Sequence, residues 1–201
     1  MNKYLIFIAS ILVITNVISV INLSHYKRSY LILSEIMSKE VQKNTPLKLN
    51  FTANIENNGI QIDSIQLEKN NCQRLSLKDF FTDEKEKVVV CRFSEMNCES
   101  CITHSINTLL KWSSYLGKEN ILYIGAYRND EIFENQKKLY GINSFHSLNI
   151  RNLNIPIEDF GYPYYFVMDR SLKVLDLFIP NKSSMSDIQN YFNAINEKYF
   201  K

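Results

Sequence analysis

The chain has 201 residues, which is enough for one compact domain with an appended segment or for two small domains. It is 45% hydrophobic and 22% charged with only 5 Gly and 4 Pro, and this composition excludes collagen-like, low-complexity and wholly disordered proteins. The net charge of +2, with no run of Lys and Arg longer than a dipeptide, argues against a nucleic-acid partner.

The first predicted element is the apolar segment from Leu5 to Leu23. At roughly 1.5 Å per residue it spans about 28 Å as a helix, close to the hydrocarbon thickness of a bilayer. Lys3 precedes it as in a signal peptide, but the apolar run is longer than is usual there, and no small-residue cleavage site follows. We therefore expect residues 1–23 to form a single-pass membrane anchor, with a removed signal segment as the alternative.

The charges that flank this segment are nearly balanced. Lys3 and the free amine stand on one side, and His25, Lys27 and Arg28 stand on the other, so the positive-inside rule leaves the orientation open. A single N-terminal anchor usually acts as an export signal, and on that ground we expect the rest of the chain to lie outside the cytoplasm.

Residues 24–45 are polar with a weak apolar stripe, and we expect a helical stalk that ends at Pro46. Beyond it, Leu47–Ala53 and Ile60–Leu67 alternate apolar and polar residues on either side of Asn57-Asn58-Gly59, a pattern typical of a β-hairpin. We expect this hairpin to open a folded domain that covers residues 46–201.

From residue 88 the pattern changes to longer strands and helices. Val88–Phe93 is a continuous apolar run, as in a central strand buried on both faces. Apolar residues then recur at helical spacing up to Leu116, with Gly117 placed as a C-terminal cap. A second strand is predicted over Ile121–Tyr127, and Asn129 can cap a second helix.

The C-terminal part begins with a predicted hairpin of Tyr164–Met168 and Val174–Ile179. A last helix follows, where Ser184 and Asp187 have the spacing of a capping box. The order β-α-β-α-β-β-α predicts an α/β fold with a mixed central sheet flanked by helices.

The strongest motif is Cys98-Glu99-Ser100-Cys101, which directly follows the first central strand and opens a helix. A thiolate at a helix N-terminus is stabilised by unpaired N–H groups and by the helix dipole, so it is reactive near neutral pH. The spacing brings both sulfurs to one side of the first turn. Cys98 would attack a disulfide and Cys101 would resolve the mixed disulfide. Zinc ligands share this spacing, but no second ligand pair is spaced correctly.

A second motif, Gly161-Tyr162-Pro163, stands immediately before the C-terminal hairpin. Proline at the start of a central strand is unusual unless its peptide bond is special. A cis bond at Pro163 would turn the chain beside the two cysteines and leave the backbone of Tyr162 free to pair with an extended substrate. The alternative is a trans proline that simply begins a strand.

These motifs, in this order from Leu75 to the C-terminus, resemble the thioredoxin superfamily, and in particular the membrane-anchored, envelope-facing thiol-disulfide oxidoreductases of the TlpA/ResA kind. The resemblance implies a thioredoxin-like fold, an extra N-terminal hairpin supplied by residues 47–67, Cys98 as nucleophile, Cys101 as resolving thiol and Pro163 as cis-proline. It implies no cofactor beyond the redox-active Cys98–Cys101 disulfide.

The same resemblance implies a location and partners. We expect a single-pass protein of the bacterial inner membrane whose catalytic domain faces the periplasm or the cell exterior. Its substrates would be protein or peptide disulfides, and a partner dithiol protein would supply electrons. The residues leave open the substrate, the redox direction and the identity of that donor.

Three positions depart from the family pattern. Asn97 stands where the family usually has Trp, and Arg92 stands where thioredoxins keep a buried Asp. His104 occupies a position where some relatives carry Glu. The usual proton relay is therefore not present in its familiar form.

His104 and Glu99 are candidate modulators of the dithiol. His104 shares a helix face with Cys101 and could act as a general base or stabilise a thiolate, or it could be an uninvolved helix histidine. Glu99 would repel a Cys98 thiolate and raise its pKa, which predicts a pair at the reducing end, unless its side chain simply points into water.

Two other functions stay open. Cys98, Cys101 and His104 could hold copper or zinc in a thioredoxin-fold metal carrier, although no fourth donor is evident and we expect no resident metal. A redox-inactive binding module is the other alternative. Of the remaining cysteines, Cys91 has the pattern of a core residue, and Cys72 could be a spare thiol or pair with another cysteine.

Overall fold

A computed structural model describes residues 45–63, 66–69, 73–82 and 85–201, together with residues 19, 22–23, 26–29, 32 and 35. The chain divides into two compact units, Met1–Leu47 and Lys48–Lys201. Most of the predicted anchor and most of the predicted stalk lie outside the described residues. Within the described part, no helix combines the length and the apolar character that a membrane crossing requires.

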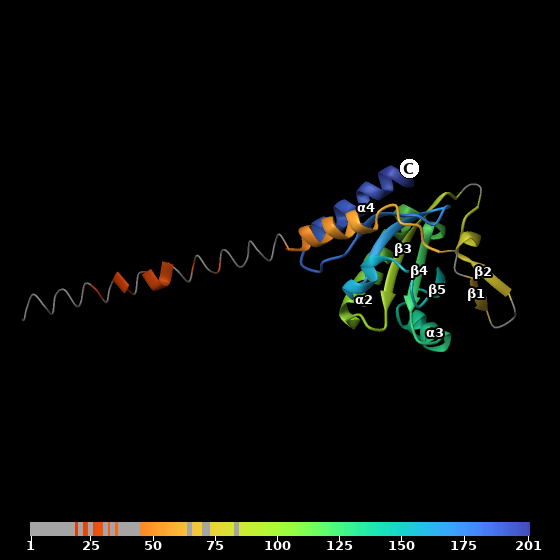
Figure 1. The fold of residues 1–201 in the computed structure, drawn as a ribbon, viewed down its shortest axis with the longest axis horizontal. Helices are drawn as coiled ribbons and strands as arrows, with labels where there is room; N and C mark the ends of the chain where they lie inside the picture. Colours follow the sequence, from red (N-terminus) through yellow and green to blue (C-terminus); the bar gives the residue numbers. More distant parts are fainter. Residues whose placement is uncertain are drawn as a thin grey trace, which may run out of the picture. The chain divides into compact units, whose positions relative to one another are not determined.

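The second unit contains a five-stranded mixed sheet in the order β5-β4-β3-β6-β7 (Figure 1). Its strands are β3 (Lys87–Ser94), β4 (Ile121–Ala126), β5 (His146–Asn149), β6 (Tyr164–Asp169) and β7 (Val174–Phe178). β3, β4 and β5 run parallel, whereas β6 is antiparallel to β3 and β7 is antiparallel to β6. The mixed sheet predicted from the sequence is confirmed.

One face of the sheet carries three helices, α2 (Glu99–Leu116), α3 (Asp130–Leu139) and α4 (Met185–Tyr199). β3 contributes Val89, Cys91 and Phe93 to this layer, because alternate side chains of a strand point to the same face. Asn129 caps α3 as expected, and its side chain accepts a hydrogen bond from the Ile132 amide.

The other face of the sheet is covered by shorter elements. Residues 45–57 are helical and place Leu49 and Ala53 against this layer, joined by the 3-10 helices η1 (Leu77–Phe80) and η3 (Pro156–Phe160). A third 3-10 turn, η2 (Lys118–Asn120), follows α2. The site described below lies where β3 leads into α2, at the end of the central strand.

The hairpin predicted for residues 47–67 is wrong. Leu47–Ala53 is helical, and the buried Asn57 side chain donates to the Ala53 carbonyl oxygen at 2.7 Å. The same sequence also puts Leu49, Ala53 and Asn57 on one face of a helix. Burial of that face against the sheet favours the helical repeat of 3.6 residues over the two-residue repeat of a strand. A two-stranded antiparallel pair does occur later, formed by β1 (Gln66–Lys69) and β2 (Gln73–Ser76).

Two smaller expectations also differ from the structure. β5 is a four-residue edge strand without an apolar run, and it was not predicted. Ser184 precedes α4, but its side chain makes no capping hydrogen bond; its hydroxyl lies 3.4 Å from that of Ser186 instead.

Candidate active site

Cys98 and Cys101 are joined by a disulfide bond at the start of α2, with their Cα atoms 5.2 Å apart. Cys98 is the N-cap residue, and its sulfur accepts a hydrogen bond from the Cys101 amide at 3.2 Å. Cys98 is exposed and Cys101 is half-buried. The motif therefore occupies the predicted place, with the outer sulfur reachable from solvent.

Asn97 holds the turn that precedes the dithiol. Its side-chain oxygen accepts from the Ser94 amide at 2.8 Å, and its side-chain nitrogen donates to the Gly161 carbonyl oxygen at 2.9 Å. The family's usual Trp could not make both contacts, because an indole has a single donor and no acceptor for the Ser94 amide. Asn97 thus ties the dithiol loop to the loop of Pro163.

The predicted cis bond before Pro163 is wrong in this structure, because no cis peptide bond occurs among the described residues. Gly161 adopts a left-handed conformation with φ 70° and ψ 20°, so the chain turns at this glycine and enters β6 through a trans bond. Pro163 is buried, whereas Tyr162 is 50% exposed. The Gly161–Asn97 hydrogen bond nevertheless brings the two predicted motifs together.

Glu99 lies beside the dithiol but is engaged by another helix. The Tyr140 hydroxyl donates to the Glu99 carboxylate at 3.0 Å, and Tyr127 is among the groups that act on the pKa of Tyr140. Burial and these partners raise the pKa of Tyr140, so it remains protonated and able to donate across the neutral range. The charge of Glu99 is thereby held toward α3.

Lys182 approaches the dithiol from the loop between β7 and α4. Its ammonium group donates to the Ser100 hydroxyl at 2.6 Å and lies 4.0 Å from the Cys98 sulfur. Ser100 Oγ is itself 3.7 Å from that sulfur. Sequence reasoning missed this residue, since no local motif links a lysine to a cysteine 84 positions away.

His104 lies one turn after Cys101 and is half-buried. Burial lowers the pKa of its imidazole, and the positive charges of Lys182 and Lys111 lower it further, so the ring is neutral at pH 7. Its Nε2 atom is buried without a hydrogen-bond partner within the described part of the chain. A neutral ring can accept a proton, which keeps the predicted general-base role among the hypotheses.

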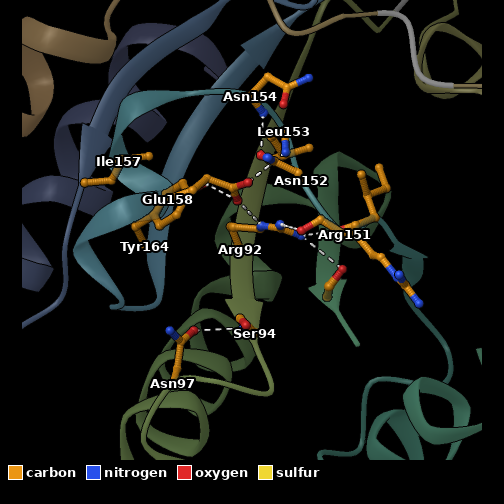
Figure 2. A network of polar contacts seen from close by, with 12 residues as sticks. Arg92, Ser94, Asn97, Arg151, Asn152, Leu153, Asn154, Ile157, Glu158 and Tyr164 are labelled. Carbon is orange, nitrogen blue, oxygen red and sulfur yellow. Dashed lines mark hydrogen bonds and ion pairs between the residues drawn. The ribbon is translucent and has the colours of Figure 1, made fainter. Parts of the chain in front are cut away.

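Arg92 is buried in β3, six positions before Cys98, with its side chain only 3% exposed. Its guanidinium group donates to the Glu158 carboxylate at 2.6 Å and to three backbone carbonyl oxygens, those of Gly125, Ile150 and Arg151 (Figure 2). A buried charge is tolerated when it is paired and hydrogen-bonded in this way. Arg92 therefore links β3 to β4, to the residues that follow β5 and to η3.

Glu158 completes this network on the other side. Its second carboxylate oxygen accepts from the Leu153 amide at 2.7 Å, and its first accepts from the Tyr164 hydroxyl at 3.2 Å. Burial, followed by the negative charge of Glu158, raises the pKa of Tyr164 well above its usual value, so this hydroxyl stays a donor. The thioredoxin carboxylate position is occupied here by a structural ion pair.

Of the two other cysteines, the structure describes only Cys91. Cys91 is fully buried among the residues under α2 and α4, and burial raises the pKa of its thiol. It is a core residue, as predicted. Cys72 lies outside the described residues.

In the part of the chain that the structure describes, no three His, Cys, Asp or Glu side chains come together as a metal site. The ligand set of the alternative hypothesis, Cys98, Cys101 and His104, is thus not assembled, and its two sulfurs are bonded to each other. The arrangement is that of an oxidised dithiol, which can be opened by two electrons and two protons.

No family model and no curated protein matches this chain. Solved structures do. A proposed protein disulfide isomerase from Bacteroides thetaiotaomicron superposes with a TM-score of 0.52 at 15% identity, over 73% of this chain and 92% of that one. A proposed DsbE thiol:disulfide interchange protein from Chlorobium tepidum gives 0.50 at 14% identity, over 70% and 98%. The fold is thioredoxin-like. An uncharacterised conserved protein from Geobacillus kaustophilus also superposes, with a TM-score of 0.50 at 15% identity over 72% of this chain and 85% of that one.

Proposed function

We propose that this chain is a membrane-tethered thiol-disulfide oxidoreductase that reduces or exchanges disulfides of proteins or peptides outside the cytoplasm. The observation that carries the proposal is the Cys98–Cys101 disulfide at the N-terminus of α2, with the first sulfur exposed and the second behind it. The thioredoxin-like fold supports this chemistry, because the dithiol follows the central strand of that fold.

The reaction begins with the reduced dithiol. The Cys98 thiolate attacks one sulfur of a substrate disulfide, so that a new S–S bond forms while the substrate bond breaks, and the departing thiolate takes up a proton. Cys101 then loses its proton and attacks the Cys98 sulfur, which releases the second substrate thiol. Two electrons pass to the substrate, and a partner dithiol protein is oxidised when it reduces the Cys98–Cys101 bond again.

The helix terminus supports Cys98 as the nucleophile. The Cys101 amide donates to its sulfur at 3.2 Å, and the positive end of the α2 dipole favours the thiolate. The half-buried position of Cys101 suits an intramolecular attack on a mixed disulfide. We propose further that an extended substrate backbone pairs with Tyr162 beside Pro163.

The membrane tether and the envelope location rest on the apolar segment from Leu5 to Leu23. Alkaline extraction of membranes from cells that express the full chain tests the tether. We expect the chain to stay in the membrane pellet, whereas release into the supernatant would contradict a spanning segment. Exposure of the catalytic domain to protease added outside the inner membrane tests the orientation.

Reduction of insulin by the full-length chain tests the activity. We expect the wild type to accelerate it with dithiothreitol as the electron source, and Cys98→Ser to abolish the acceleration. Cys101→Ser should accumulate a mixed disulfide with the substrate and lose turnover, while Cys72→Ser serves as a matched cysteine control. Equal activity in the wild type and in both active-site variants would overturn the proposal.

A further inference from the structure

Lys182 lies in the loop between β7 and α4, and the start of this loop is fixed by a side chain from the helix of residues 45–57. The Ile179 amide donates to the Asn50 side chain at 2.6 Å, and the Asn50 amide group donates back to the Ile179 carbonyl oxygen at 3.1 Å. Around Lys182 the loop forms a local turn, in which the Asn181 side chain accepts from the Ser183 amide at 3.0 Å. The lysine backbone therefore lies in a hydrogen-bonded turn that follows an anchored residue, and the side chain extends from there to the dithiol.

The ammonium group of Lys182 faces the outer sulfur. It donates to Ser100 Oγ at 2.6 Å and lies 4.0 Å from Cys98 Sγ, with Ser100 Oγ 3.7 Å from the same sulfur. Ser100 uses its lone pairs to accept from the lysine, which leaves its hydroxyl proton free to point at the sulfur. Two donors thus converge on the atom that becomes negatively charged when the disulfide is reduced.

The acidic groups next to Cys98 are directed elsewhere. Glu99 accepts from Tyr140 on α3, and Tyr140 in turn contacts Tyr127. Glu95, in the loop before the dithiol, accepts from the Arg128 amide at 3.1 Å and pairs with its side chain at 3.9 Å. The positive charge of Lys182 is therefore the one that directly meets the sulfur.

The neighbouring histidine responds to the same charge. After burial, Lys182 is the largest cause of the lowered pKa of His104, ahead of Lys111. His104 is neutral at pH 7 and adds no charge of its own. Among the described residues, the side chains with a polar contact to the Cys98 sulfur outside the disulfide are the Lys182 ammonium group and the Ser100 hydroxyl.

We propose that Lys182 is a catalytic residue of this dithiol, and that its ammonium group stabilises the Cys98 thiolate of the reduced protein. The proposal rests on the proposed function. It has a definite sign, because stabilising the reduced form makes the disulfide more oxidising, whereas the charge of Glu99 acts in the opposite direction.

The pH dependence of Cys98 alkylation in the fully reduced, full-length chain tests this. Iodoacetamide labels thiolates, and peptide mass spectrometry follows Cys98 separately from Cys72 and Cys91. We expect Lys182→Met to raise the apparent pKa of Cys98 by about half a unit to one unit, since Lys182 is exposed and partly screened. Lys182→Arg should retain the wild-type pKa, and Lys138→Met on the surface of α3 should leave it unchanged.

Salt gives a second readout. At 1 M salt the screening length falls to about 3 Å, so the difference between the wild type and Lys182→Met should shrink. The disulfide of Lys182→Met should also equilibrate with glutathione as a more reducing pair than the wild type. The proposal would be overturned if the pH dependence of Cys98 alkylation were the same in the wild type and in Lys182→Met. A chain inactive on insulin with the predicted alkylation shift would instead contradict the proposed function alone.

Discussion

Two cations differ in their surroundings. Arg92 is close to the dithiol in the sequence, six positions before Cys98, and Lys182 is close to it in space. Arg92 is buried and makes four hydrogen bonds, to one carboxylate and three carbonyl oxygens. Lys182 is exposed and contacts a hydroxyl and a sulfur. The charge of Arg92 is used within the fold, while the charge of Lys182 is available to a thiolate.

This contrast explains a departure from the thioredoxin pattern. At the sequence position where thioredoxins keep a buried carboxylate, six residues before Cys98, this chain has Arg92, whose guanidinium group already has a carboxylate partner in Glu158 (Figure 2). In the proposal made above, the charge that acts on Cys98 is that of the exposed Lys182, and Arg92 has a structural role. Removing the buried cation should then cost stability, and removing the exposed one should change the chemistry.

The largest expected effect follows from breaking the buried pair. Arg92→Met leaves the Glu158 carboxylate with a side-chain exposure of 17% and without its cation. We expect the free energy of unfolding to fall by about 3–5 kcal/mol, as is usual when one partner of a buried pair is removed. Urea denaturation of the wild type and the variant measures this difference.

Arg128→Met is the matched control for that experiment. Arg128 is 73% exposed and faces Glu95 at 3.9 Å, so its loss should change the free energy of unfolding by about 0.5 kcal/mol or less. If Arg92→Met unfolded at the same urea concentration as Arg128→Met, the structural role of the buried network would be refuted.

A smaller effect is expected at the loop that joins the two motifs. Asn97→Ala removes the hydrogen bonds to Ser94 and Gly161, which should cost about 1–2 kcal/mol of stability. Because the dithiol loop is then no longer tied to the Pro163 loop, kcat/KM for insulin reduction should fall by up to about tenfold. Thermal unfolding and initial rates measure the two effects.

Asn152→Ala provides the comparison for Asn97→Ala. Asn152 is exposed, and its side chain accepts a single local hydrogen bond from the Asn154 amide at 2.7 Å. Its loss should leave kcat/KM unchanged. Equal rates in both alanine variants would show that the tie to Gly161 does not position the dithiol.

The smallest expected effect concerns pH. The pKa of His104 is lowered in the folded chain, so below about pH 6.5 the unfolded chain binds a proton that the folded chain does not. Stability should therefore fall as the pH drops from 7 toward the folded pKa, and His104→Gln should make this fall shallower.

Urea denaturation at pH 7 and pH 5.5 checks this difference between the wild type and His104→Gln. His146, whose pKa is lowered by burial and by Lys85, contributes equally to both chains and cancels. An equally steep fall in stability in both chains would mean that the surroundings of His104 do not lower its pKa.

The central elements of the fold could be predicted because local pattern and tertiary environment agree. Val88–Phe93 is apolar throughout and becomes a buried strand, and Cys98 both starts the helix pattern and caps α2. Residues 47–53 fit a strand and a helix equally well, and only burial of Leu49 and Ala53 against the sheet selects the helix. Pattern alone could not resolve that choice.

Of the candidate site, the sequence predicts only the residues that form a recognisable motif. The spacing of Cys98 and Cys101 identifies them in the sequence. Lys182 contacts Cys98, and Tyr140 contacts Glu99, from positions distant in sequence. Asn97 was noticed as a departure from a family pattern, but its two hydrogen bonds depend on where the Gly161 loop lies. Such contacts require the folded topology.

The central claim is that Cys98 and Cys101 form a bond that opens and closes reversibly. Equilibration of the full-length chain in glutathione buffers of increasing reducing power, followed by alkylation and peptide mass spectrometry, measures it directly. We predict that the two cysteines change together, from joined to doubly alkylated, in a single two-electron transition that is the same from either direction. A pair that stays joined, or stays open, across the whole range would contradict the account.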